Sequence, residues 1–272
     1  MDVQDKVYWH EAFFEALQLE FHREQEFLEF VAEYPLSKEA LIMDVLVIKK
    51  RPGKRIDKNI GRIFRTHNIF EFKSEKDSLL ERDYNKVIAY ALLYSSFTPA
   101  PVSDITVSFV VTVHPRELIK YLRNERGLAV RITDDGIYYV EGDTFPVQIL
   151  ESKLLPPDEN LFLRNLRSNL SIKDVTMTAE AYKMLKPLEK RNVYFDRLRQ
   201  ANLKTFKEAL SMSESMKELF FEVAEQEGWN VPDMLENFRA KKIAKKLLHL
   251  GRPVEEVVEA TELPYETVIG LA

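Results

Sequence analysis

The segment LIMDVLVI, residues 41–48, decides the fold class because apolar side chains fall on both faces of the strand that it predicts. A strand that is apolar on both faces belongs in the middle of a sheet that is covered on both sides. One charged residue, Asp44, interrupts this run. An unpaired carboxylate in such a place is costly, so we expect Asp44 to take part in an ion pair or to bind a metal.

The segments around this run predict the rest of the sheet. NIFEFK at residues 68–73 alternates apolar and polar side chains, and ITVSFVVTV at 105–113 is rich in β-branched residues. Asp135-Gly136 lies between two alternating runs within residues 128–142, which predicts a hairpin. Further strands are expected at 26–34 and 145–155, and helices at 7–21, at 81–97 and directly after Pro115.

The character of the sequence changes at Pro156-Pro157, and nearly everything beyond predicts helix. The sequence therefore predicts an α/β fold, with a mixed central sheet flanked by helices, followed by an all-α C-terminal region. We expect an α/β core at residues 1–155, a helical region at 156–236 and a short helical tail at 237–272. The expected C-terminal helices lie at 174–186, 192–210, 213–227 and 231–249.

Composition narrows the functional classes. The chain has 272 residues, enough for a sizeable core, and a formal net charge of -5, so any binding to nucleic acid must rest on a local basic patch. The absence of cysteine excludes disulfides, thiolate zinc sites and cysteine nucleophiles. The N-terminal residues do not resemble a secretory signal, and no apolar stretch is long enough to cross a membrane. We therefore expect a soluble cytoplasmic protein.

The strand at residues 68–73 carries a carboxylate and an ammonium on one face. Residues two apart in a strand project to the same side, so Glu71 and Lys73 point one way while Phe70 and Phe72 point the other. Together with Asp44, Glu71 and the backbone carbonyl of Phe72 would suit Mg²⁺, which prefers oxygen ligands and keeps several waters. Lys73 would then position an attacking water. The alternative is an Asp44–Lys73 ion pair with Glu71 in solvent.

Glu-x-Lys is a weak signal by itself. A second copy occurs at Glu151-Ser152-Lys153, where it follows no strand with a buried Asp and precedes Pro156-Pro157 instead of a helix. We interpret this second copy as an ordinary strand end.

A dense basic segment separates Asp44 from Glu71. KKRPGKRIDKNIGRIFR, residues 49–65, contains eight basic residues and one acid. Such a segment can hold a nucleic-acid backbone beside the proposed metal, in a salt-sensitive interaction. The alternative is a solvated loop. The basic residues are Lys49, Lys50, Arg51, Lys54, Arg55, Lys58, Arg62 and Arg65.

Asp44 in an apolar strand, then Glu71-Phe72-Lys73, then a helix resembles the pattern of the PD-(D/E)XK nuclease superfamily. The phrases IFEFKS, DYNKVIAYALLY and IAKKLLHLGRPVEEVVEATELPYETV resemble its recombination-promoting nuclease or putative transposase group. The resemblance implies a restriction-endonuclease-like core and Mg²⁺-dependent hydrolysis of DNA phosphodiesters, linked to recombination or mobile elements. It also allows a catalytically inactive relative that binds nucleic acid or a protein.

Carried over by position, the resemblance assigns metal binding to Asp44 and Glu71, and assistance of the nucleophile to Lys73. A glutamate of the first helix often completes such sites, and Glu11 and Glu15 both fit that description. The helix after the lysine often supplies a polar residue, for which Tyr84 and Lys86 are the candidates. In the family motif the aspartate is preceded by proline, whereas here Met43 precedes Asp44.

The remaining features favour structural roles. The five histidines show no metal-ligand spacing, and His67 alone lies near the proposed site in sequence. The tail from residue 240 predicts three short helices broken at Gly251-Arg252-Pro253 and at Leu263-Pro264. Its last helix contains none of the residues that usually contact base edges, which favours packing, protein contact or homo-oligomerisation through the helical half.

Overall fold

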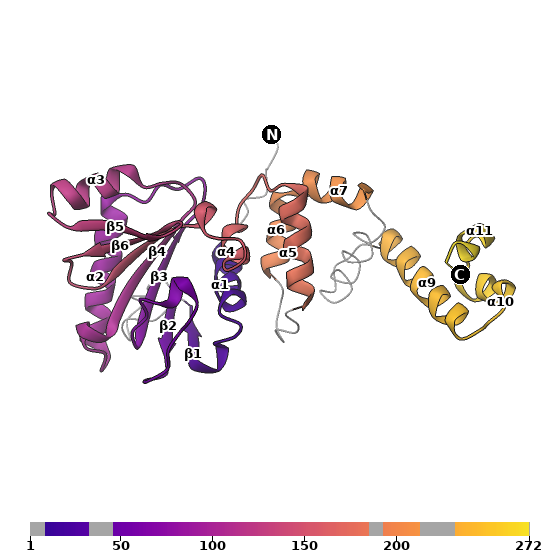
Figure 1. Cartoon of the computed structure of the whole chain (residues 1–272), viewed down its shortest axis with the longest axis horizontal. Helices are drawn as coiled ribbons and strands as arrows, with labels where there is room; N and C mark the ends of the chain where they lie inside the picture. Colours follow the sequence, from indigo (N-terminus) through magenta and orange to yellow (C-terminus); the bar gives the residue numbers. More distant parts are fainter. Residues whose placement is uncertain (1–8, 33–45, 185–192, 213–231, 272) are drawn as a thin grey trace. The chain divides into compact units, whose positions relative to one another are not determined.

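The computed structural model of the chain describes residues 9–32, 46–184, 193–212 and 232–271 (Figure 1). Contacts divide the chain into two compact units, Met1–Asp174 with Asn192–Leu203, and Val175–Arg191 with Lys204–Ala272. The unit that holds the sheet continues past the predicted boundary at 155. It contains every candidate site residue identified from the sequence.

The first unit is built on a seven-stranded mixed sheet in the order β1-β2-β3-β4-β7-β6-β5. The first three strands form an antiparallel meander, β3, β4 and β7 are parallel, and β7, β6 and β5 are antiparallel. This confirms the predicted α/β class with a mixed central sheet. The strands are β1 (Leu28–Val31), β2 (Leu46–Lys50), β3 (His67–Lys73), β4 (Ile105–Val111), β5 (Ala129–Asp134), β6 (Ile137–Glu141) and β7 (Val147–Glu151).

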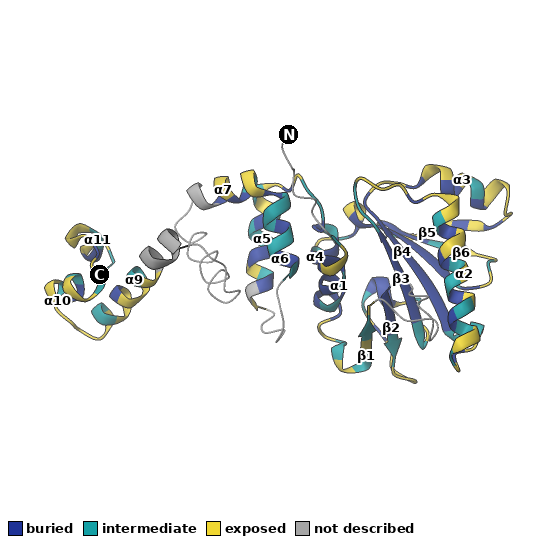
Figure 2. Ribbon diagram, turned by 180° about the vertical axis from the view of Figure 1, so that it is seen from behind, coloured by how far each residue is buried: buried dark blue, intermediate teal, exposed yellow. Residues whose placement is uncertain are grey.

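Helices cover both faces of this sheet, as Figures 1 and 2 show. On one face, helices α2 (Glu81–Phe97) and α3 (Arg116–Asn124) bury an apolar cluster against the strands, including Val107 and Ile149. On the other face, α1 (Trp9–Glu20) places Phe13 in a stack on Phe72 of β3, with ring centroids 4.8 Å apart. The central strands are therefore buried on both sides, as the run at residues 41–48 predicts for its described part, where Leu46, Val47 and Ile48 are buried.

Strand β3 has the predicted alternation. Phe70 and Phe72 face the α1 side, whereas Ile69 joins the cluster beneath α2, so Glu71 and Lys73 also lie on the α2 side. The hairpin predicted around Asp135-Gly136 is confirmed between β5 and β6, where Gly136 adopts a φ of +71° that favours glycine.

The rest of the described chain is helical, as predicted, with one difference. The helix expected at 192–210 is two helices, because the Asn202 side chain interrupts it by bonding the carbonyls of Leu198 and Arg167 and the N–H of Leu170. The helix expected at 213–227 lies outside the described residues. The observed helices are α4 (Leu161–Arg164), α5 (Ile172–Met184), α6 (Val193–Ala201), α7 (Leu203–Met212), α9 (Pro232–His249), α10 (Val254–Thr261) and α11 (Tyr265–Ile269).

The tail forms the predicted three helices α9, α10 and α11. The chain breaks at Gly251 and at Glu262, both of which have a positive φ. A small apolar cluster formed by Ala244, Val257, Leu263 and Val268 holds the three helices together. None of the described helices is both long enough and apolar enough to cross a membrane.

Candidate functional site

Glu71 and Lys73 meet at the carboxyl end of β3. The Lys73 Nζ lies 3.3 Å from Glu71 Oε1 and 3.1 Å from Oδ1 of Asp83, which comes from the first turn of α2. The side chains of Glu71 and Lys73 are only 10% and 20% exposed. The alternative that leaves Glu71 in solvent is therefore wrong, since this carboxylate is buried and paired.

Asp83 connects this strand end to the helix that follows. Its other carboxylate oxygen accepts the backbone N–H of Leu80 at 3.0 Å, which satisfies one of the free donors at the start of α2. Asp83 was not among the predicted site residues. The available signal was an acidic residue in the first turn of the helix, a position that the helix dipole favours.

The electrostatics of this cluster fix the charge on Lys73. Burial by itself would lower the Lys73 pKa, but the hydrogen bond to Asp83 and the charge of Glu71 outweigh it and raise the pKa above its usual value. Burial likewise opposes ionisation of Asp83, yet the Leu80 N–H and the Lys73 ammonium lower the pKa of this carboxyl. At neutral pH the Lys73 ammonium and the Asp83 carboxylate are therefore both charged, and they lie in direct contact.

None of the other predicted side-chain metal ligands is described in contact with Glu71 or Lys73. Asp44 lies outside the described residues, and the described pairing of β3 with β2 ends at Leu46↔Phe70, two residues before Phe72. Both glutamates considered on α1 engage α6. Glu15 accepts the Tyr194 N–H at 2.7 Å, and Glu11 lies 3.9 Å from Arg197.

The two candidates on α2 also have other contacts. The Tyr84 hydroxyl donates to Asp143 at 2.5 Å, and its ring stacks on Phe109. Burial and the bond to Asp143 raise the Tyr84 pKa well above its usual range, so this phenol stays protonated. Lys86 lies over the ring of Tyr90 at the exposed surface. These contacts favour structural roles for both residues.

The basic segment between β2 and β3 is anchored by apolar residues and partly neutralised. Ile56, Ile60 and Phe64 are buried, which fixes the path of the loop. Lys58 forms a 2.6 Å ion pair with Glu20, whose buried carboxyl has a raised pKa because burial outweighs the lysine charge. Six of the seven other cations contact nearby groups: Lys49 pairs with Glu29, Lys50 donates to the Lys54 carbonyl, Lys54 lies over Phe27, Arg55 pairs with Asp57, Arg62 with Asp134, and Arg65 donates to the Ser103 carbonyl.

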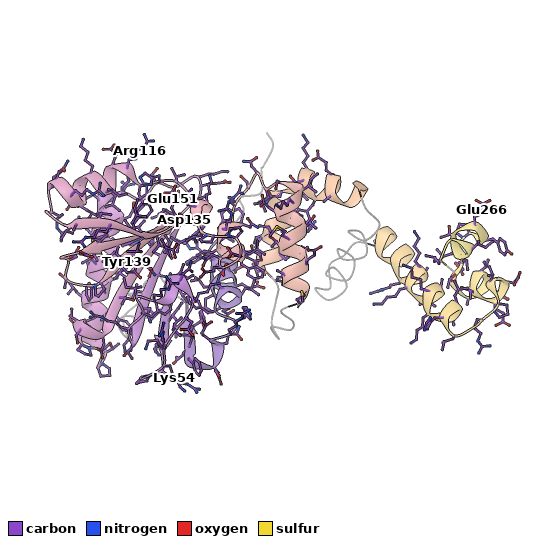
Figure 3. The ribbon with its side chains drawn as sticks, viewed as in Figure 1. Lys54, Arg116, Asp135, Tyr139, Glu151 and Glu266 are labelled. Atoms are coloured by element: carbon purple, nitrogen blue, oxygen red, sulfur yellow. The ribbon has the colours of Figure 1, made fainter. Side chains whose placement is uncertain are left out.

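Much of this segment lies at the opposite end of β3 from Lys73. Lys49 is paired in register with His67, the first residue of β3, and Lys73 is the last. Six residues of strand separate the two ends by about 20 Å. Glu151 is the last residue of β7 and marks the carboxyl end of the parallel strands. Figure 3 shows Lys54 well away from it, toward the opposite end of the strands. The structure therefore does not place the cations at the amino end directly beside Glu71.

A second polar cluster occupies the carboxyl end of β7. Oε2 of Glu151 is 2.7 Å from Nδ1 of His114 and accepts a 3.0 Å bond from the Tyr138 hydroxyl. Burial, followed by the bond to Glu151, raises the pKa of Tyr138 to about 12. Strand β7 does end at Glu151, but it is not an ordinary strand end. His114 follows β4 in the chain and reaches Glu151 only because β4 pairs with β7. No local pattern in the sequence predicts that pairing.

The chemistry of these groups suits a hard cation, although no complete metal site is described. Glu71 and the Phe72 carbonyl offer oxygen donors, and Asp44 would add a second carboxylate. Within the described ranges, no group of three or more His, Asp or Glu side chains could hold a metal ion.

Comparison with known proteins adds no assignment: no family profile, no curated protein and no solved structure matches this chain.

Proposed function

We propose that this chain is a Mg²⁺-dependent DNA endonuclease of the PD-(D/E)XK type that acts in recombination or on mobile elements. The observation that supports this proposal is the pair of Glu71 and Lys73, which meet at the carboxyl end of β3 and are shielded from bulk water. Helix α2 follows directly, as in the sequence pattern that suggested the family.

Glu71, the Phe72 carbonyl and Asp44 would hold the metal ion. When bound, Mg²⁺ lowers the pKa of a water molecule and stabilises negative charge on a phosphate. The donor set fits this ion in kind, because two carboxylates and a carbonyl are all oxygen ligands. Asp83 is engaged by Lys73 and the Leu80 N–H, so its role is to hold Lys73.

Lys73 acts as a hydrogen-bond donor. Its raised pKa keeps the ammonium charged at neutral pH, so it donates protons in hydrogen bonds and cannot accept one from water. In that state it orients a water or a phosphate oxygen and offsets negative charge that develops on the phosphate. A proton acceptor must therefore be supplied by another group.

The exposed cations near the amino end of β3 would bind the DNA backbone. About 20 Å from Lys73 corresponds to about six base pairs of B-DNA, so one duplex can contact both ends of the strand. Arg51, Lys54 and Arg55 are exposed. Lys58 is not part of this surface, because it neutralises the buried Glu20.

Cleavage of supercoiled plasmid in Mg²⁺ tests the proposal. Wild type is expected to nick or linearise the plasmid, a chelator to abolish cleavage, and Asp44→Asn and Lys73→Ala to lower the rate by at least about 100-fold. Lys153→Ala, which changes the exposed lysine of the second Glu-x-Lys copy, is the matched control and should cleave normally. Equal rates in all variants, with folding verified by urea unfolding, would contradict the proposed site.

A non-catalytic nucleic-acid-binding protein is the second candidate. The observation that favours it is the placement of Lys73 between Glu71 and Asp83, since such an ion pair also stabilises a fold without any chemistry. This candidate predicts salt-dependent DNA binding without cleavage and without a requirement for metal.

DNA binding is tested by a triple charge reversal, Arg51→Glu, Lys54→Glu and Arg55→Glu. Because each lost phosphate contact removes about 0.9 from the slope of log affinity against log salt, the slope should become shallower by about 2 to 3. The control is reversal of three exposed cations elsewhere, Lys204, Lys207 and Arg252. An equal loss of affinity in both triple variants would show that the effect is one of net charge alone.

A further inference from the structure

The cluster of His114, Glu151 and Tyr138 lies on the same edge and the same face of the sheet as Lys73. Strands β3, β4 and β7 are parallel, and their register aligns Lys73 with Val111 and Val111 with Glu151. Val111 and Ile149 belong to the cluster beneath α2 and α3, so Glu151 projects to that face as Lys73 does. Two strand spacings separate the Lys73 and Glu151 backbones by about 10 Å.

The hydrogen bonds of this cluster orient the imidazole. An ionised carboxylate only accepts hydrogen bonds, so Nδ1 of His114 must carry the proton in its 2.7 Å contact with Glu151. The Tyr138 hydroxyl donates to the same carboxylate oxygen, and Glu151 is buried to 11% exposure of its side chain. The carboxylate is therefore fixed from two sides, by β6 and by the segment that follows β4.

This arrangement leaves the other ring nitrogen of His114 for chemistry. With Nδ1 protonated, neutral imidazole presents a lone pair at Nε2, and no described residue hydrogen-bonds that atom. The His114 side chain is 39% exposed, so water and substrate can reach it. A histidine whose far nitrogen is held by a buried carboxylate has the geometry of a general base.

We propose that His114, oriented by Glu151 and Tyr138, is the general base that takes the proton from the attacking water in phosphodiester hydrolysis at this edge. The inference rests on the proposed nuclease function. His114 Nε2 removes one proton from water, the water oxygen bonds to phosphorus, and the phosphorus–oxygen bond to the leaving nucleotide breaks. The leaving oxygen takes a proton from solvent, and His114 returns its own proton to solvent.

The spacing is compatible with one substrate that contacts both clusters. The strand positions that hold Lys73 and Glu151 are about 10 Å apart, so one nucleic-acid substrate, which extends over more than that length, can contact both clusters. Lys73, which stays protonated, and His114, which can accept a proton, therefore have complementary roles. Among the described residues, the charged or titratable groups that contact His114 are Glu151 from β7 and Tyr138 from β6, and Arg116 lies two positions further along the chain.

Three measurements on plasmid cleavage test this role. The wild-type rate should rise with pH, because only a neutral imidazole accepts a proton, and His114→Ala should lower it by about 100-fold or more and remove that rise. Added imidazole should restore part of the rate in His114→Ala. His249→Ala, at an exposed position on α9, is the control and should match wild type with no response to imidazole.

A fourth measurement, of the His114 tautomer, needs neither metal nor enzymatic activity. In ¹⁵N NMR of the metal-free protein, the neutral His114 ring should be protonated at Nδ1, and Glu151→Gln should reduce that preference. An active wild type that depends on Lys73 but is indifferent to His114→Ala, or a loss in His114→Ala with an unchanged pH profile and no imidazole rescue, would overturn the inference alone. A wild type that never cleaves would overturn the proposed function together with it.

Discussion

The two Glu-x-Lys copies of this chain lie at the ends of β3 and β7, which are separated by β4 in the same sheet. They differ in whether the strand extends as far as the lysine. Strand β3 continues through Lys73, so Glu71 and Lys73 share a face and form a 3.3 Å ion pair. Strand β7 stops at Glu151, and Lys153 lies in the turn Ser152–Leu154, where it is exposed. The same spacing therefore produces a buried pair in one place and separates the two residues in the other.

The partners of the two glutamates also differ. Glu71 is compensated by its own lysine, which is in turn held by Asp83 from α2. Glu151 has instead His114, from the segment that follows β4, and Tyr138, from β6. One strand end thus holds a positively charged ammonium, whereas the other holds an imidazole, which has both a donor and an acceptor nitrogen when neutral. In the proposed reaction these two groups have different roles.

Removal of each lysine is expected to give the largest contrast. Lys73→Met leaves Glu71 and Asp83 close together without their shared cation, whereas Lys153→Met changes an exposed side chain. Loss of one partner of a fully buried pair costs about 3 to 5 kcal/mol; since Lys73 is partly exposed, we expect about 2 kcal/mol. For Lys153→Met we expect less than about 0.5 kcal/mol. Urea unfolding at pH 7 measures both free energies.

The double variant Lys73→Met with Asp83→Asn sharpens this test. If the cost arises from repulsion between two carboxylates that no longer share Lys73, removal of one of them should recover part of the lost stability, with a coupling of about 1 kcal/mol. Equal costs for Lys73→Met and Lys153→Met would mean that the 3.1 and 3.3 Å contacts of Lys73 do not stabilise the fold.

Alkaline pH is expected to weaken the second cluster by a smaller amount. The Tyr138 pKa is about 12 in the folded protein, against a usual value of 10.0. A raised pKa means that its contribution is fully present below pH 10 and is lost as the pH rises from 10 to 12. Between pH 9 and pH 11 the free energy of unfolding of wild type should therefore fall by about 1 kcal/mol more than that of Tyr138→Phe.

Urea unfolding of wild type and Tyr138→Phe at pH 9, 10 and 11 measures this difference. Other groups also titrate over this range, including Lys73 and Tyr139, and they are common to both proteins. The comparison of the two slopes therefore isolates Tyr138. Parallel slopes would show that Tyr138 ionises as an ordinary exposed phenol and does not hold Glu151.

The individual strands of the sheet could be predicted because their signals are local. Alternation in NIFEFK, the β-branched run at 105–113 and the Asp135-Gly136 turn each predict one element from residues next to each other in sequence. The break at Asn202 could not be predicted, because its amide bonds Arg167 and Leu170, more than thirty positions away. A helical pattern alone cannot report such a tertiary contact.

The site could be predicted only in part for the same reason. The parity of a strand places Glu71 with Lys73, and the structure confirms that they meet. The partners of Glu151 depend on the non-consecutive pairing of β4 with β7, which no local pattern contains. The basic segment was likewise identified by composition. Its position relative to the two ends of β3 depends on the antiparallel pairing of β2 with β3, which composition does not show.

The smallest expected effect is that of Asp83, the carboxylate that holds Lys73 of the Glu71-Phe72-Lys73 copy. Asp83→Asn keeps an oxygen acceptor but loses the charge that holds Lys73, so we expect a loss of about 0.5 to 1 kcal/mol at pH 7 by urea unfolding. Asp77→Asn, which alters an exposed residue bonded to Ser74, is the matched control and should cost less. Because the folded pKa of Asp83 is lowered from 3.8, its contribution is present above that pH and is lost as the pH falls through the folded value. The difference between wild type and Asp83→Asn should thus shrink in acid; a difference that persists there would mean that Asp83 acts through the shape of the helix start and that its charge does not hold Lys73.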